Sequence, residues 1–250
     1  MKKDKLQSMT EETGFVKKRV FYSEIAYLMA IVILPFGVLM MTRAEFGVPM
    51  VAAPAYMLYL KLSEYFPFFT FGMAEYIVQG LLLISAAIAV RKFRIGYLFS
   101  FATTLIYGVI LDLWSSLTAD ILLNGFMIRL ATYATGYLIS IFAVVLFFKS
   151  YIAPEAYELF VKEIAAKFGF RLHVVKLIYD YSSCFIGVLL SFIFYGFGNF
   201  VGVNVGTLPC ALLNGWLIAL ITKGIDRIFV FKDAFPLRRF FTAALSGEEE

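Results

Sequence analysis

The chain has 250 residues, of which 61% are hydrophobic and only 16% are charged, and its formal net charge is +4. A soluble domain has about a quarter of its residues charged, so this composition argues against one. The basic residues form short clusters between apolar runs rather than one patch, which excludes the pattern typical of a nucleic-acid-binding surface. With two cysteines and one histidine there is no metal-ligand spacing, and we expect neither a metal nor another cofactor.

The first half of the chain contains three apolar runs long enough to cross a membrane, since about 18 residues span a hydrocarbon core of about 30 Å. Residues 1–20 are polar, and no small-residue cleavage site follows the first run, so we interpret that run as a retained helix rather than a signal peptide. A shorter stretch, 48–60, is too short to span and is expected to be re-entrant or interfacial. The predicted spans are 25–42, 70–90 and 95–116.

The second half repeats this order. A short polar loop leads to a span, then to an amphipathic stretch too short to cross, and then to two further spans. The predicted spans are 125–148, 174–197 and 203–222, and the short helix is 154–168. The prediction is therefore an all-α membrane protein with six transmembrane helices.

The distribution of basic residues tests this number of spans. Short cytoplasmic loops are enriched in Lys and Arg. With the N-terminus inside and six crossings, 19 of the 22 basic residues lie on the cytoplasmic side, and only Arg43, Lys61 and Arg129 lie outside. A seventh crossing at 48–60 would move the cluster around Arg91 outward. We therefore expect a multi-pass protein of the cell membrane with both termini in the cytoplasm.

The repeated order predicts two inverted repeats, because three spans per half reverse the orientation of the second half. Pro54 and Pro154 open the two short helices at equivalent places. The predicted units are a cytoplasmic segment 1–20, a first membrane repeat 21–120, a second membrane repeat 121–225 and a cytoplasmic tail 226–250. The alternative is that there is no repeat, because any protein with six spans can be divided into two groups of three spans.

Three ionisable residues fall near the outer ends of predicted spans, at similar depth. Charges at membrane depth are costly, about 2.5–3.5 kcal/mol or more, so such residues face protein or water. Glu75, Asp112 and Arg129 are therefore predicted to form an outer network that serves as a gate or as a substrate and proton site. The alternative is a buried ion pair without a transport role, which we favour for Arg129 and Asp112.

A second group lies on the inner side. Lys176 and Asp180 are four residues apart and share a helix face, as do Glu75 and Gln79 at the equivalent place in the first half. Gln79 and Asn214, in the middle of their spans, are candidates for hydrogen bonds to a substrate. Lys176 could instead extend its ammonium group to the membrane interface.

Three segments carry a resemblance to a known family. They are the loop Phe46-Gly47-Val48-Pro49, the stretch APEAYELFVKEIAAKFGFRLHVVKLIYD at 153–180, and the last span, which opens with Gly202-Val203-Asn204-Val205-Gly206-Thr207. Over roughly residues 20–230 the chain resembles the YczE/YyaS/YitT-like family of bacterial integral membrane proteins. The resemblance implies a multispanning inner-membrane protein, for which transport is a plausible function.

The leading hypothesis is a secondary transporter of a small polar metabolite, vitamin-like or amino-acid-like, with proton coupling through Asp180 or Glu75. The alternatives are a substrate-binding subunit of an ATP-driven importer, which six spans and the pair of small residues Ala26 and Ala30 on the first span permit, and a membrane regulator or scaffold that transports nothing. No catalytic constellation is recognisable, so we do not expect an enzyme. The expected partners are the lipid bilayer, a small-molecule substrate and, as one option, a second copy in a homodimer.

Overall fold

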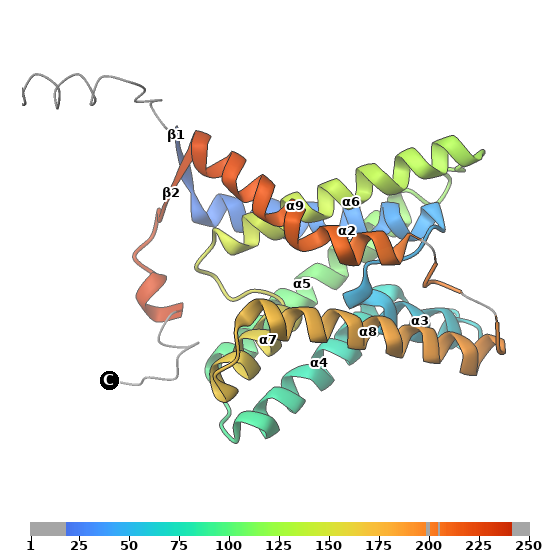
Figure 1. Ribbon diagram of the computed structural model, residues 1–250, viewed down its shortest axis with the longest axis horizontal. Coiled ribbons are helices and arrows are strands. Elements are labelled where there is room, and N and C mark those ends of the chain that lie inside the picture. Colours follow the sequence, from blue (N-terminus) through green and yellow to red (C-terminus); the bar gives the residue numbers. More distant parts are fainter. Residues whose placement is uncertain (1–18, 199–200, 205, 242–250) are drawn as a thin grey trace, which may run out of the picture.

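The computed structural model describes residues 19–198, 201–204 and 206–241, and most of it is helical. The first half contains a strand, a long helix, a short helix and two more long helices (Figure 1). These elements are β1 (Arg19–Tyr22), α2 (Ser23–Ala44), the 3-10 turn η1 (Met50–Ala52), α3 (Ala53–Ser63), α4 (Phe71–Val90) and α5 (Ile95–Leu117).

The second half has the same order of long, short, long and long helices, followed by a strand. Its elements are α6 (Phe126–Phe148), α7 (Ala156–Phe168), α8 (Leu172–Tyr195), α9 (Thr207–Ile228) and β2 (Phe229–Lys232). Five of the long helices, α2, α4, α5, α6 and most of α8, are long and apolar enough to cross a membrane. The prediction of a multi-pass helical membrane protein is therefore confirmed at this level.

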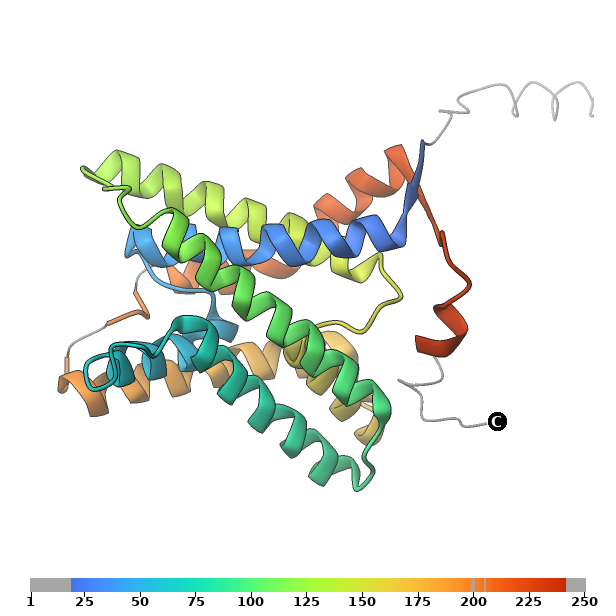
Figure 2. The ribbon, with the colours of Figure 1, turned by 180° about the vertical axis from the view of Figure 1, so that it is seen from behind.

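The helices form two layers. In Figure 1, α2, α6 and α9 lie in one layer, and α3, α4, α7 and α8 lie in the other. Figure 2 shows α5 crossing from α4 in the second layer to α2 in the first, and α5 packs on both of these helices and on α7. A cavity lies between the two layers, and the charged residues described below line it.

The centre of the first layer is the contact between α2 and α6, where two glycines let the backbones meet. A Cβ atom on Gly37 would lie 2.8 Å from the carbonyl oxygen of Gly136, and one on Gly136 would lie 2.8 Å from that of Gly37. Small residues at a helix crossing allow this close approach in membranes. Ala26 and Ala30 of α2 are also fully buried, in the core that α2 shares with Phe147.

Two loops from opposite halves meet at the end of the first layer. The amide of Val48 donates to the carbonyl of Gly202, at 2.9 Å, and the amide of Gly206 donates to the carbonyl of Phe46, at 2.9 Å. The Thr207 hydroxyl donates to the Val48 carbonyl at 3.2 Å. These contacts hold Val203, Asn204 and Gly206 outside the helix, so the predicted start of the last span at residue 203 is wrong, and α9 begins at Thr207.

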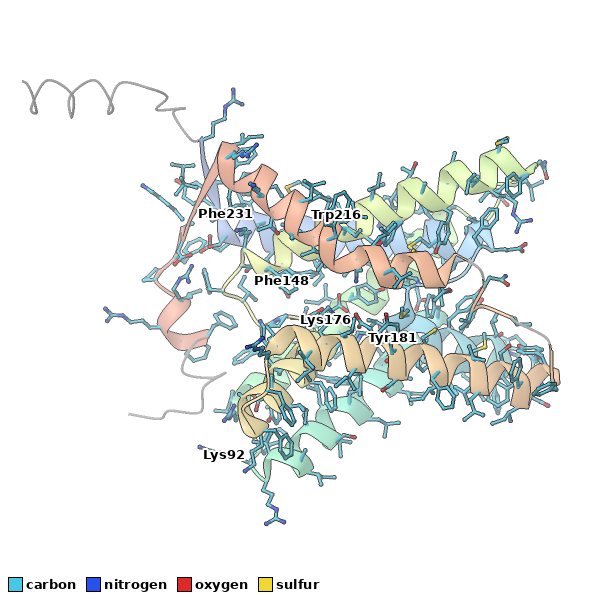
Figure 3. The ribbon with its side chains drawn as sticks, in the orientation of Figure 1. Lys92, Phe148, Lys176, Tyr181, Trp216 and Phe231 are labelled. Atoms are coloured by element: carbon cyan, nitrogen blue, oxygen red, sulfur yellow. The ribbon has the colours of Figure 1, made fainter. Side chains whose placement is uncertain are left out.

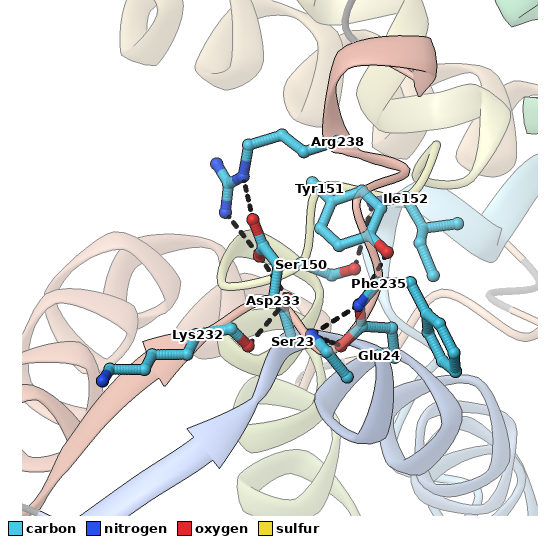
Figure 4. Close-up of polar contacts among 10 residues, drawn as sticks. Ser23, Glu24, Ser150, Tyr151, Ile152, Lys232, Asp233, Phe235 and Arg238 are labelled. Atoms are coloured by element: carbon cyan, nitrogen blue, oxygen red, sulfur yellow. Dashed lines mark hydrogen bonds and ion pairs between the residues drawn. The ribbon is translucent and has the colours of Figure 1, made fainter.

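Two short parallel strands pair with each other: β1, which precedes the first helix, and β2, which follows the last. The all-helical prediction did not include this strand pair. Beside the strands, Glu24 accepts hydrogen bonds from the Tyr151 hydroxyl at 2.7 Å and from the amide of Ala234 at 3.0 Å (Figure 4). Hydrogen bonds from Arg238 and Ser23 lower the pKa of Asp233 to about 2. This strand pair and its polar contacts are called the clasp below.

The Gly37–Gly136 contact predicts a stability effect. Gly136→Ala should destabilise the protein by about 1–3 kcal/mol, because the new Cβ would press on the Gly37 carbonyl and on Met40. The measurement is the thermal unfolding midpoint of the detergent-purified protein. Gly224→Ala in α9 is the matched control, since its Cβ would meet nothing within 4 Å. Equal midpoints for the two variants would contradict the proposed packing.

Candidate functional site

Two neighbouring turns of α4 place Glu75 and Gln79 in the protein interior, and both side chains are fully buried. The Gln79 amide donates to Glu75 Oε2 at 3.1 Å, and its oxygen accepts from the Thr104 hydroxyl at 2.6 Å. The backbone amide of Ala156 also donates to that oxygen, at 3.2 Å. Gln79 therefore links α4 to α5 and to the first residue of α7.

The start of α7 lies against these residues. The Tyr157 hydroxyl donates to Glu75 Oε2 at 2.6 Å. The segment just before α7 is held by α5, because the Thr103 hydroxyl donates to the Ala153 carbonyl at 2.9 Å and the Ser100 hydroxyl donates to the Pro154 carbonyl. Glu155 occupies the N-cap position of α7, where the helix dipole favours a negative charge.

An ion network connects α7 with α8. The Lys176 ammonium lies 2.7 Å from Glu158 Oε1 and 3.9 Å from Asp180 Oδ1. Figure 3 shows Lys176 on α8, at the side that faces the other helix layer. The longer distance is beyond a hydrogen bond, and Asp180 Oδ1 has no other partner among the described residues. One ammonium group therefore compensates two carboxylates.

These groups surround a cavity of about 130 Å³ between the two layers. Apolar side chains of α2 and α6 form much of its wall, and polar and aromatic groups come from α4, α5, α6, α8 and α9 and from the start of α7. The charged lining residues are one lysine and four acids, and the other polar or aromatic ones are Tyr107, Tyr137, Ser140, Phe147, Tyr157, Cys210 and Asn214.

The carboxylates of this cavity are not fully compensated. Glu75 Oε1 and Glu155 Oε1 are buried and have no hydrogen-bond partner among the described residues. Glu155 lies outside the five apolar helices, and burial, together with the nearby charges of Glu75 and Glu158, raises its pKa well above the usual value for a glutamate. Buried acceptors without partners are unfavourable, so the cavity can accept either protons or a ligand that donates hydrogen bonds.

Five of the seven predicted site residues belong to this site. Glu75, Lys176, Asp180 and Asn214 line the cavity, and Gln79 hydrogen-bonds to Glu75. The structure thus brings together residues that the sequence assigned to an outer and an inner group. Glu75 faces Tyr157 because the start of α7 lies beside the first turns of α4.

The predicted network of Glu75, Asp112 and Arg129 is wrong. Asp112 accepts from the Thr70 hydroxyl at 2.6 Å and from the amide of Gly72 at 2.9 Å, so it caps the N-terminus of α4. Arg129 lies at the start of α6 and binds the end of α2 instead, through Glu45 at 2.8 Å and the Ala44 carbonyl at 3.0 Å. Similar depth did not place these residues on facing sides of their helices.

Sequence reasoning missed Glu155, Tyr157 and Glu158 as site residues. They lie in the amphipathic helix 154–168, outside the predicted spans in which site residues were sought. The available signal was their position directly after Pro154, at the start of a helix too short to span. A re-entrant helix brings its N-terminus into the protein interior, and carboxylates at such a terminus are candidates for a buried site.

The comparisons with known proteins place the chain in one family. A model described as a family of unknown function (DUF6198) matches residues 21–223, so the chain belongs to this family. No curated protein and no solved structure matches the chain. The match does not test the resemblance to the YczE/YyaS/YitT-like family, which stays a prediction.

The ion network predicts a double-mutant effect. Lys176→Met should destabilise the protein by about 3 kcal/mol, the lower end expected for breaking a buried pair, because it leaves Glu158 and Asp180 uncompensated. Adding Glu158→Gln should restore part of this loss. The measurement is thermal unfolding of the single and double variants.

The exposed Lys162, on the same short helix as Glu158, offers a control. Lys162→Met should change the stability by no more than about 0.5 kcal/mol. The network would have no energetic role if Lys176→Met behaved like this control.

Proposed function

We propose that this member of a family of unknown function is a six-span secondary transporter of a small polar metabolite. The observation that carries the proposal is the cavity between the two helix layers, lined by charged residues from both halves of the chain. Ionisable residues at membrane depth are costly and mark substrate or ion pathways in membrane proteins. A small polar solute would bind there and be released to either side.

The sixth span of this proposal is α9. Its 22 residues extend about 33 Å at 1.5 Å per residue, which is enough to cross a hydrocarbon core. Asn214 in α9 lines the cavity. The charged residues Lys223, Asp226 and Arg227 belong to its last two turns, and Asp226 pairs with Lys149 at 2.6 Å. The apolar part of α9 would then lie in the membrane and its charged end at the cytoplasmic surface.

The packing of the helices supports an inverted repeat. The pair α2 and α5 has its counterpart in α6 and α9, and the pair α3 and α4 has its counterpart in α7 and α8. Each short helix also packs on a long helix of the other half, α3 on α8 and α7 on α4. In Figure 1, α2 and α6 run in opposite directions, as do α4 and α8. Repeats of opposite orientation around a central site suit alternating access.

The two alternative functions receive less support. Ala26 and Ala30 are buried in the core of the chain itself, so they offer no face to an ATPase partner. A regulator or scaffold needs no central cavity, and uncompensated carboxylates around one would only lower its stability. Transport gives these groups a purpose, because they can release and rebind a cation or proton in each cycle.

Access to the cavity can be tested before the substrate is known. The chain has two cysteines, so Cys184→Ser leaves Cys210 as the only thiol, and Cys210 lines the cavity. We expect a membrane-impermeant thiosulfonate to label Cys210 both in right-side-out and in inside-out vesicles. An alternating transporter opens the same cavity to each side in turn.

Cys210→Ser with Cys184 retained is the matched control, and it reports any labelling at the other thiol. Labelling of Cys210 from one side only, or from neither side after prolonged exposure, would overturn the transport proposal. The Cys210 thiol contacts the Tyr133 hydroxyl at 3.0 Å, so denatured protein should give the full labelling against which both vesicle types are compared.

A further inference from the structure

We propose that the cavity binds a small organic ammonium ion, held by the free carboxylate oxygens of Glu75 and Glu155. This inference deepens the proposed transport function by naming a substrate class, and it rests on that function only for the movement of the ligand. The binding itself is argued from the charges, hydrogen bonds and size of the cavity.

The charge of the lining favours a cation. Glu75, Glu155, Glu158 and Asp180 contribute four carboxylates, and Lys176 contributes the one ammonium group among the described lining residues. Lys176 pairs with Glu158 and approaches Asp180, so neither Glu75 nor Glu155 forms an ion pair within the cavity lining, although the charge of Lys176 also favours the ionised form of Glu155. An anionic substrate such as a phosphate ester would meet a surplus of negative charge, whereas a monovalent cation would reduce it.

The hydrogen bonds favour a ligand that donates. Glu75 Oε2 already accepts from Tyr157 and Gln79, whereas Glu75 Oε1 and Glu155 Oε1 have no donor among the described residues. Both side chains are more than nine-tenths buried, and both line the cavity. A primary ammonium group has three donors and no acceptor. It would therefore satisfy both oxygens with charge-assisted hydrogen bonds, which are the stronger kind.

Size and composition favour an organic ion over a bare metal ion. An engineered apolar cavity of about 150 Å³ holds benzene, so a cavity of about 130 Å³ suits a ligand of a few heavy atoms. The rings of Tyr107 and Phe147 line it and attract cations through their π-faces. Hard metal ions take about six oxygen ligands, and the described part of the chain has no group of three or more acidic, His or Cys side chains that could hold one.

The test is binding of methylammonium to the full-length protein in detergent at mildly alkaline pH, measured by calorimetry and by thermal shift. Sodium at equal ionic strength is the inorganic probe, and acetamide is the neutral one. We expect saturable binding of methylammonium and no saturable response to sodium or acetamide. Glu155→Gln and Glu75→Gln should each weaken binding about tenfold or more, because each removes a charged acceptor.

Glu163→Gln is the matched control on α7. Glu163 is also buried, but it binds Arg94 at 2.6 Å and Tyr97 at 3.1 Å, and it does not line the cavity. The Glu163→Gln variant should bind methylammonium like the unmodified protein. Without ligand, Glu155→Gln should unfold at a higher temperature than the unmodified protein, since it removes a buried carboxylate that lacks a hydrogen-bond partner at Oε1 and that is repelled by Glu75. Glu155→Gln is thus expected to gain stability while it loses binding. The test therefore remains valid if Glu75→Gln fails to fold.

Protons should compete with the ammonium ion. The pKa of Glu155 is raised, so its carboxylate takes up a proton at a higher pH than an ordinary glutamate does. The affinity for methylammonium should therefore fall as the pH is lowered, and Glu155→Gln should flatten this dependence. The titratable groups of the cavity are Glu75 of α4, Tyr107 of α5, Tyr137 of α6, Glu155, Tyr157 and Glu158 at α7, Lys176 and Asp180 of α8, and Cys210 of α9.

Each outcome decides between the two proposals. Equal binding of sodium and methylammonium, or no binding of either, would overturn the organic-cation inference even if Cys210 is labelled from both sides of the membrane. Methylammonium binding that is lost in Glu155→Gln, with labelling from one side only, would retain the cation site and overturn transport. Unchanged binding in both glutamine variants would show that the cation binds elsewhere and would also overturn the inference.

Discussion

The hydrogen bonds that hold the start of α7 determine the site. The hydroxyls of Ser100 and Thr103 bind the carbonyls of Pro154 and Ala153, and the side chain of Gln79 accepts from the amide of Ala156. In an apolar surrounding, a helix N-terminus needs such partners, because its first amides and the preceding carbonyls have none within the helix. Once this end is fixed between α4 and α5, Glu155 and Tyr157 must face Glu75. The chemistry of the cavity follows from this placement.

The same principle holds the other short helix in place by different means. The segment before α3 is held through the backbone of Phe46 and Val48, which binds Gly202, Gly206 and the Thr207 hydroxyl at or before the start of α9. In each half, a hydroxyl of the last long helix donates to a carbonyl just before the short helix of the other half. The two hydroxyls are Thr103 of α5 and Thr207 of α9. The two short helices are thus tied across the halves. Movement of one half relative to the other would act on both of them.

Much of the helical architecture could be predicted from the sequence, because long apolar runs and clusters of basic residues report directly on membrane crossing. The run 70–90 and the helix Phe71–Val90 agree closely, and so do 95–116 and Ile95–Leu117. The start of α9 could not be predicted, since the sequence directly before Thr207 has no proline or charged residue that would end a span, and contacts of Gly202 and Gly206 with loop 46–48 are not visible in it. The strand pair depends on residues at opposite ends of the chain, which no local pattern records.

The candidate site was predicted in part for a related reason. Glu75, Gln79, Lys176 and Asp180 stand out because charged or amide groups are rare inside apolar runs. Which of them meet depends on helix rotation, and rotation is set by packing rather than by depth. Asp112 illustrates this, because the close approach of α4 and α5 at Gly72 brings its carboxylate to the amide end of α4 and away from Glu75. Glu155 was hidden because its own segment is polar.

The clasp imposes an order on the biogenesis of the protein. Tyr22 pairs with Lys232, and Ser23 binds Asp233, 210 residues further along the chain. At about 5–20 residues per second, a ribosome needs on the order of 10–40 s to make that stretch. During this time β1 emerges next to the first inserted helix with its strand edge unpaired. The clasp can therefore close only after α9 has been made, and its closure would mark a chain whose helices have all been delivered to the membrane.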